Sequence, residues 1–149
     1  MRYRAAAAAA ASLGVAVQAL GVREPDDFDA AFAAMTQEMP DGILMVTDSL
    51  TGPYRKRVFE FAAAHRLPSI YEYEFLARDG GLMADGPDGK EWGERVADLV
   101  QHILRGGKPA ELPFEQPTPC RFVINLKTAN ALGLKIPPML LARADEVID

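Results

Sequence analysis

Two tyrosines and two glutamates alternate at the end of a short apolar stretch, in the order Tyr71, Glu72, Tyr73 and Glu74. If the backbone stays extended, the tyrosines lie on one face and the glutamates on the other. A close pair of carboxylates can perform acid–base chemistry when the neighbouring charge raises one pKa. No residue beside the pair supplies a nucleophile or an oxyanion donor, which argues against catalysis. Tyrosines at the end of a strand suit stacking on a ligand or covering a sheet edge.

A second polar cluster, Thr47, Asp48, Ser49 and Thr51, follows the apolar run Gly42–Val46. The continuous run predicts a strand buried on both faces, as in a parallel sheet between helices. Ligands of open α/β sheets collect beyond the carboxyl ends of such strands, which would place these side chains at a binding site. The alternative is that Asp48 and Ser49 only turn the chain and cap the next helix. From the residues alone, this alternative is favoured.

The composition is that of a soluble globular protein of one ordinary domain, with 149 residues, 49% apolar and 25% charged. A net charge of −5 and the absence of a basic stripe argue against binding to nucleic acid. Cys120 is the only cysteine, and His65 and His102 lie far apart without ligand spacing. The sequence therefore predicts neither a metal site nor a bound cofactor, and it excludes an internal disulfide.

The hydrophobic pattern alternates between strands and helices, which predicts an α/β fold with a parallel, Rossmann-like sheet in three layers. A helix at residues 89–104 carries the apolar stripe Trp92, Val96, Leu99, Val100 and Ile103. The predicted strands are Val15–Leu20, Gly42–Val46, Ser69–Tyr71, Leu82–Ala84 and Cys120–Leu126. The predicted helices are Arg4–Leu13, Asp26–Glu38, Tyr54–His65, Gly89–Leu104 and Lys127–Leu132. A last helical turn is predicted in 139–148.

The two ends of the chain have their own character. The first residues, with a basic opening and seven alanines, imitate a signal peptide, but alanine is only weakly hydrophobic, so helix then strand is favoured. No run is long and apolar enough to predict a transmembrane helix. Near the other end, four prolines in 108–119 predict an extended segment that spans a surface.

Long motifs in this chain resemble a known family. GLMADGPD at 81–88, ILRGGKPAELPFEQPT at 103–118 and FVINLKTANALGLKIPPMLLARADEVID at 122–149 are very similar to the ending of the solute-binding proteins of an ABC transporter family. The segments GVREPDDFDAAFAAM, DGILMVTDSLT and HRLPSIYEYEFLARDGG fit the same family in the same order. The resemblance covers residues 5–149.

The resemblance implies a periplasmic-binding-protein type I fold, in which two Rossmann-like lobes are joined by a hinge. A small solute, such as an amino acid or a related compound, would bind in the cleft, and the loaded form would dock on the ABC permease subunits. The implied location is the periplasm, although this chain carries no convincing signal peptide. No catalysis is implied.

The chain departs from the family in length, because a two-lobe protein would be about twice as long. The first lobe and the opening strand of the second lobe have no counterpart here. Residues 1–107 are therefore expected to form a truncated second lobe, and 108–149 to pack back on it or on a partner chain. Loss of the central strand leaves an unpaired sheet edge, so we expect a homodimer, formed by strand exchange through the extended tail.

The resemblance also gives a partial site. Thr47, Asp48 and Ser49 match the loop that faces ligand in the family, and the segments Tyr71–Glu74 and Ala84–Gly86 match two further loops. The acidic residues Asp48, Glu72, Glu74 and Asp85 would make this face favour a ligand with an amine or another cationic group. The alternative is a solvated acidic rim, which is favoured on general grounds.

Two functions of other classes stay open at this point. Half a cleft cannot enclose a ligand, so the chain is alternatively a truncated remnant that acts as a non-catalytic oligomeric α/β protein. A small flavodoxin-like enzyme using Glu72 and Glu74 is the weakest interpretation, because the sequence has no glycine-rich phosphate loop, nucleophile or metal site. Our prediction is a solute-binding protein and not an enzyme.

Overall fold

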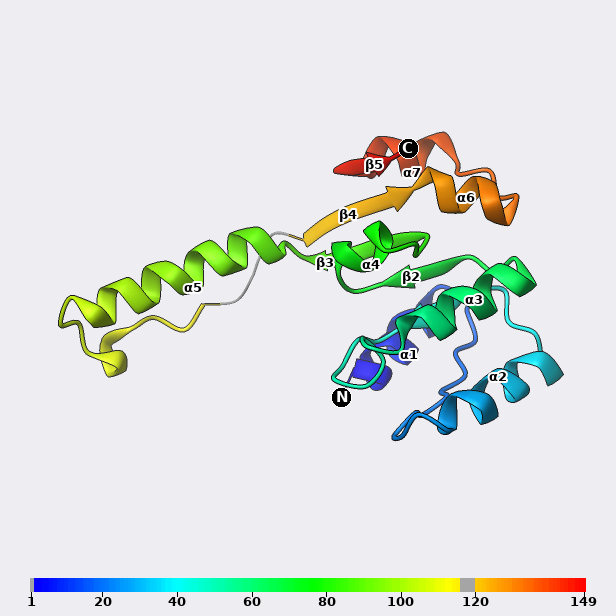
Figure 1. The fold of residues 1–149 in the computed structure, drawn as a ribbon, viewed down its shortest axis with the longest axis horizontal. Helices are drawn as coiled ribbons and strands as arrows, with labels where there is room; N and C mark the ends of the chain where they lie inside the picture. Colours follow the sequence, from blue (N-terminus) through cyan, green and yellow to red (C-terminus); the bar gives the residue numbers. More distant parts are fainter. Residues whose placement is uncertain (1, 116–119) are drawn as a thin grey trace.

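The computed structural model describes residues 2–115 and 120–149, which fold as an α/β protein (Figure 1). Its helices are α1 (Arg2–Ser12), α2 (Asp27–Gln37), α3 (Arg55–His65), α4 (Glu74–Arg78), α5 (Gly89–Leu104), the 3₁₀ helix η1 (Pro109–Glu111), α6 (Leu126–Leu132) and α7 (Pro138–Arg143). Its strands are β1 (Ile43–Met45), β2 (Ser69–Tyr71), β3 (Met83–Pro87), β4 (Cys120–Asn125) and β5 (Glu146–Ile148).

The five strands form one sheet in the order β1-β2-β3-β4-β5. β1, β2 and β3 are parallel, β4 runs antiparallel to β3, and β5 is again parallel to β4. The carboxyl ends of β1, β2 and β3 therefore meet at one edge of the sheet, where the polar clusters of the sequence lie. The predicted α/β class is confirmed, and the sheet that was predicted to be parallel is mostly so, with β3 and β4 as its one antiparallel pair in the described residues.

Two hydrophobic cores cover opposite faces of the sheet. Ala84 belongs to a core with residues of α2, α3 and α4, whereas Met83 packs against a core with Ala129 and Leu132 of α6. Consecutive strand residues point to opposite faces, so the helices lie on both sides and the fold has three layers. On the first face the rings of Phe32 and Phe61 stack at 4.6 Å and hold α2 against α3.

The predicted strand Val15–Leu20 is wrong: these residues lie outside the five-stranded sheet. A strand requires a neighbour that completes its hydrogen-bond ladder, and no strand in the described part of the chain pairs with this segment. For the same reason β1 is an edge strand, and the prediction that it is buried on both faces is also wrong. Leu44, at its centre, is 54% exposed.

The last quarter of the chain packs on the rest through β4. Asn125, at the end of β4, is buried; its side-chain amide donates to the carbonyl of Ala77 in α4 at 2.8 Å, and its side-chain oxygen caps α6 by accepting from the Thr128 N–H at 3.0 Å. The predicted helical turn at the end of the chain is wrong in part, because β5 follows α7. The backbone of Val147 and its neighbours pairs with β4, and this pairing overrides their weak local preference for a helical turn.

Helix α5 lies apart from the sheet that most other elements surround (Figure 1). Figure 1 shows that it projects away from the sheet, and that the chain after it runs back alongside it. None of its residues is buried. The predicted apolar stripe is present, but none of its residues belongs to the two cores described above. Of the predicted extended segment 108–119, η1 interrupts the first part, and 116–119 lie outside the described residues.

None of the helices in residues 2–115 and 120–149 is long and apolar enough to cross a membrane.

Candidate functional site

A hydrogen bond joins the carboxyl ends of β1 and β2. The backbone N–H of Thr47, just after β1, donates to a carboxylate oxygen of Glu72, just after β2, at 2.8 Å. The two residues are 25 positions apart in the chain, and parallel pairing of Met45 with Tyr71 brings them side by side. Glu72 therefore fixes the position of the loop that follows β1.

Strand β3 contacts the backbone of Glu72 through Gly86. A Cβ atom on Gly86 in β3 would lie 1.8 Å from the Glu72 carbonyl oxygen, far inside van der Waals contact. Only glycine lets β3 approach the Glu72 backbone this closely. Asp85, the residue before it, is exposed. The predicted loops after β1 and β2 and the predicted segment of β3 thus come together around Glu72.

Asp48 also shapes the loop itself. One carboxylate oxygen accepts hydrogen bonds from the N–H groups of Leu50 and Thr51, both at 2.8 Å, which closes an Asx turn. The hydroxyl of Thr51 donates to the Val46 carbonyl at 2.9 Å and accepts from the Asp48 N–H at 2.9 Å. The turn-forming role that the sequence suggested for Asp48 is therefore present. Ser49 lies exposed in the same loop.

Tyr71 lies inside the first core, not at the edge of the site. It is 1% exposed, its ring packs edge-on against Phe59 at 5.2 Å, and its hydroxyl donates to Ser69 Oγ at 3.0 Å. Burial raises the pKa of the Tyr71 hydroxyl to about 12. With no open surface for a solute, Tyr71 is left out of the site that we propose below.

The buried hydroxyl of Tyr71 predicts a loss of stability at alkaline pH. Its pKa is about 12 in the folded protein against 10.0 for a free tyrosine, so the unfolded chain releases this proton first as the pH rises. The free energy of unfolding should fall by roughly 2–3 kcal/mol between about pH 10 and about pH 12. Urea denaturation should show that Tyr71→Phe removes this part of the fall, and that Tyr54→Phe, at an exposed position, keeps it.

The two glutamates of the alternating pattern have separate surroundings. Glu72 bonds the loop after β1, whereas Glu74, the first residue of α4, pairs with Arg121 of β4 at 3.4 Å and with Arg78 at 3.8 Å. Arg121 in turn contacts Glu146 at 2.9 Å. Because α4 begins at Glu74, the extended conformation ends there, and the alternation that suggested an acid–base pair does not continue through Glu74. Arg121 is a site neighbour that the sequence did not indicate.

An aromatic ring lies beside Tyr73, and a guanidinium group lies over that ring. Its ring stacks on Phe75 at 5.9 Å, and the Arg55 guanidinium lies 6.0 Å from the Phe75 centroid. Arg55, at the start of α3, also donates to the Gly52 carbonyl at 3.0 Å and to Asp79 at 2.8 Å. Arg55 therefore ties the loop after β1 to the end of α4. Sequence reasoning missed Arg55 and Phe75, since nothing in the spacing relates residues 20 positions apart.

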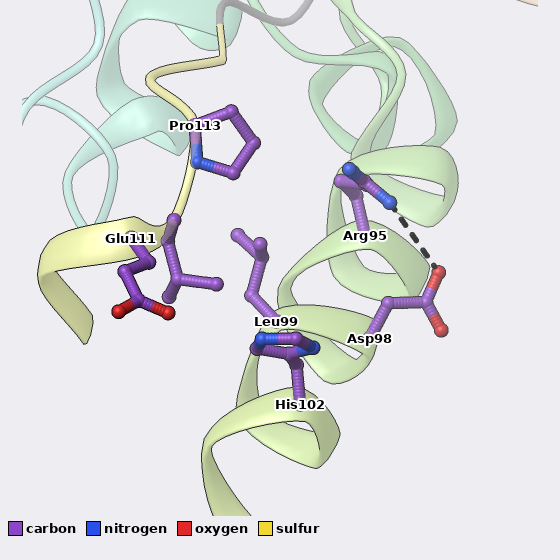
Figure 2. A pocket seen from close by; sticks show the side chains of 7 residues that line it. Arg95, Asp98, Leu99, His102, Glu111 and Pro113 are labelled. Atoms are coloured by element: carbon purple, nitrogen blue, oxygen red, sulfur yellow. Dashed lines mark ion pairs between the residues drawn. The ribbon is translucent and has the colours of Figure 1, made fainter. Parts of the chain in front are cut away.

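A cavity of about 250 Å³ lies elsewhere, between α5 and the returning segment (Figure 2). Leu99, His102, Glu111 and Pro113 are among its lining residues, and none of these comes from the sheet. It is smaller than the usual pockets for organic ligands, which span about 300–1,000 Å³. Within the described residues no group of His, Cys, Asp and Glu side chains has the arrangement of a metal site.

Comparison with solved structures shows the same fold in proteins twice as long. An ABC domain from Streptococcus pneumoniae in complex with L-Trp has a TM-score of 0.87 at 24% identity, over 99% of this chain and 50% of that one. A conserved domain protein from Vibrio cholerae has a TM-score of 0.86 at 24% identity, over 97% of this chain and 49% of that one. A substrate-binding protein with adhesive properties from Clostridium difficile, in a ligand-free, open structure, has a TM-score of 0.69 at 18% identity. The match covers 98% of this chain and 48% of that one.

The chain therefore spans about half the length of the solved structures that it matches. No curated protein matches it in sequence. The family model of ABC transporter substrate-binding proteins matches residues 2–148, nearly the whole chain. The matched range contains Gly86 and the loops around Glu72, and on this evidence the chain belongs to the ABC transporter substrate-binding protein family.

Proposed function

We propose that this chain supplies one half of a cleft that binds a small solute with an amino group, such as an amino acid, for an ABC importer. The solute would lie against the loops after β1 and β2 and against Asp85 of β3. Substrate-binding proteins of this family bind solutes and work with permease subunits rather than catalyse reactions. The proposed place of action is outside the cytoplasmic membrane.

The observation that carries this proposal is the junction at Glu72. Its carboxylate accepts from the Thr47 N–H at 2.8 Å, and its backbone touches Gly86. Three neighbouring parallel strands thus end at one preorganised surface, which is where ligands bind in open α/β sheets. A surface already fixed in the free protein loses less conformational entropy when a solute binds.

The charge of this surface supports a cationic group on the solute. Asp48 and Asp85 are exposed, whereas Glu74 is compensated by Arg121 and Arg78. The acidic character predicted from four residues thus depends on Asp48, Glu72 and Asp85. An ammonium group near exposed carboxylates gains about 0.2–1 kcal/mol for each.

The solute would need a second wall, because good binding sites bury most of the ligand surface. The solved structures that the chain matches are twice its length, and one of them is in complex with L-Trp. We therefore expect the chain alone to bind weakly, with a dissociation constant near 1 mM or above, equivalent to about 4 kcal/mol or less.

Three indole compounds with different charges test the proposal. Tryptamine carries only an amine, L-tryptophan carries an amine and a carboxylate, and indole-3-acetate carries only a carboxylate. Isothermal titration calorimetry should detect the first two and not the third, and Asp85→Asn should weaken tryptamine binding about fivefold, equivalent to about 1 kcal/mol. The matched control is Asp41→Asn, an exposed residue before β1 that should change nothing. Preference for indole-3-acetate would contradict the proposed chemistry.

The alternative function, a non-catalytic oligomeric protein, has one specific observation in its favour. Helix α5 has no buried residue, although its apolar stripe includes a tryptophan. Sedimentation of the purified chain tests this alternative, because a monomer at micromolar concentration would contradict an oligomeric role.

A further inference from the structure

The side chain of Arg121 in β4 contacts three carboxylates with one guanidinium group. Its Nη2 lies 2.9 Å from Glu146 of β5, whereas its Nη1 lies 3.4 Å from Glu74 and 3.9 Å from Asp88. The side chains of all four residues are between 22% and 31% exposed, so water and salt screen these pairs less than pairs on the open surface. The planar fork of an arginine presents its nitrogen atoms to different partners in a fixed geometry, which the ammonium group of a lysine does not.

Two of these carboxylates lie beside the solute site. Glu74 is the first residue of α4 and follows Glu72 by two positions. Asp88 comes directly after β3 and caps α5, because its carboxylate accepts from two N–H groups in the first turn of that helix, at 2.9 and 3.2 Å. Arg121 Nη1 therefore joins the segment that follows β2 to the segment that follows β3.

The third carboxylate holds the guanidinium group in place. Glu146 lies in β5, opposite Val123 of β4. Both of its oxygens also accept from the two terminal nitrogens of Arg78 in α4, at 2.7 and 2.6 Å. Glu146 is thus fixed by the sheet and by α4, and it fixes Arg121 in turn.

The backbone of Arg121 supports the same region. In the antiparallel pairing of β3 with β4, Arg121 lies opposite Gly86, the residue whose Cα lies against the Glu72 carbonyl. Side chains two positions apart on a strand share a face, so Arg121 points to the same side as Val123, which belongs to the core that includes α4. Glu72 is therefore held by β3 at its own backbone and, two residues later, by the pair of Glu74 with Arg121.

We propose that Arg121 is a positioning residue for the solute site. It holds the start of α4 against the end of β3, and this keeps the Glu72 carboxylate on the Thr47 N–H. Arg121 acts through Glu74 and Asp88 and not by contact with the solute. Its link to binding rests on the proposed function, whereas its effect on the hydrogen bond between Thr47 and Glu72 exists in the free protein.

Tryptamine binding separates positioning from a simple effect of charge, because the two predict opposite signs for Arg121→Gln. If Arg121 only neutralised its neighbours, its loss would make the site more acidic and tighten binding of the cation by up to about fivefold. Positioning predicts binding at least about threefold weaker, because the solute must then order a loosened surface. Arg143→Gln removes the same charge at an exposed position of α7 and should leave the affinity unchanged.

The conservative variant Arg121→Lys keeps the charge but not the fork, so it should still bind tryptamine more weakly than the wild type. Wild-type affinity of Arg121→Lys would show that charge alone suffices. Equal or tighter binding by Arg121→Gln would show that the residue does not position the site. Either result would overturn the proposal.

Amide hydrogen exchange of the free protein tests positioning without a solute. In Arg121→Gln the Thr47 amide should exchange at least about tenfold faster, because its hydrogen bond to Glu72 opens more often. The Thr128 amide, which donates to Asn125 at 3.0 Å, should keep its rate if β4 and α6 remain folded. An unchanged rate at Thr47 would overturn the proposal. Faster exchange at Thr47, in a protein whose wild type binds no tryptamine, would support the positioning of Glu72 by Arg121 and contradict the proposed solute.

Discussion

Replacing Gly86 with alanine should lower the free energy of unfolding by about 2–3 kcal/mol and abolish solute binding. The added methyl group would lie 1.8 Å from the Glu72 carbonyl oxygen and 2.8 Å from its carbonyl carbon. Both atoms belong to the backbone, so no side-chain rotation relieves the overlap. Either β3 moves away from β2 or the loop at Glu72 shifts, and the hydrogen bond to Thr47 is lost in both cases.

Gly89→Ala is the matched control, three residues further along. A Cβ atom at Gly89 would meet nothing within 4 Å, and the residue lies in the first turn of α5. Urea denaturation should therefore show equal or slightly higher stability for this variant. Equal stability of Gly86→Ala and wild type would mean that β3 does not touch the Glu72 backbone, and the three-strand surface would have to be abandoned.

Asn125→Ala should lower the free energy of unfolding by about 3 kcal/mol, the other large effect we expect. Asn125 is 5% exposed, and its side chain contacts two helices, α4 and α6. Its loss leaves the buried Ala77 carbonyl without this donor and removes the N-terminal cap of α6. These two effects have separate physical origins, so their costs should add.

A graded series separates the two contributions of Asn125. Asn125→Ser keeps a cap for α6 but cannot reach the Ala77 carbonyl, so it should recover about 1 kcal/mol relative to alanine. Asn130→Ala, at an exposed position of α6, should cost little. A loss below about 1 kcal/mol for Asn125→Ala would show that β4 does not depend on this residue to join α4 and α6.

Much of the fold could be predicted because the pattern of apolar residues follows the period of each element. The spacing of Phe28, Ala31 and Met35 matches the buried side of α2. The failures are non-local. Val15–Leu20 has the composition of a strand, but pairing depends on a neighbour that local patterning does not reveal. The 139–148 segment has helical residues, yet its end pairs with β4.

The site was predictable in outline only. The rule that ligands gather at strand ends correctly brought Thr47, Glu72 and Asp85 to one edge of the sheet. The alternating Tyr–Glu pattern placed Tyr71 beside these three residues. In the structure, its hydrogen bond to Ser69 and its contact with the ring of Phe59 hold it in the core. The ion pair of Glu74 with Arg121 joins residues far apart in sequence, which periodicity cannot detect. Likewise, the stripe on α5 identified an apolar face but not its open position.

Amide chemical shifts recorded during titration with tryptamine would locate the solute on the protein. We expect shifts at Thr47, Glu72 and Gly86, the three positions that meet at the carboxyl ends of β1, β2 and β3. Amides beside the α5 cavity, such as those of Leu99 and Leu112, should not move. Shifts confined to the α5 cavity, or no shifts at millimolar tryptamine, would contradict a solute site at the strand ends.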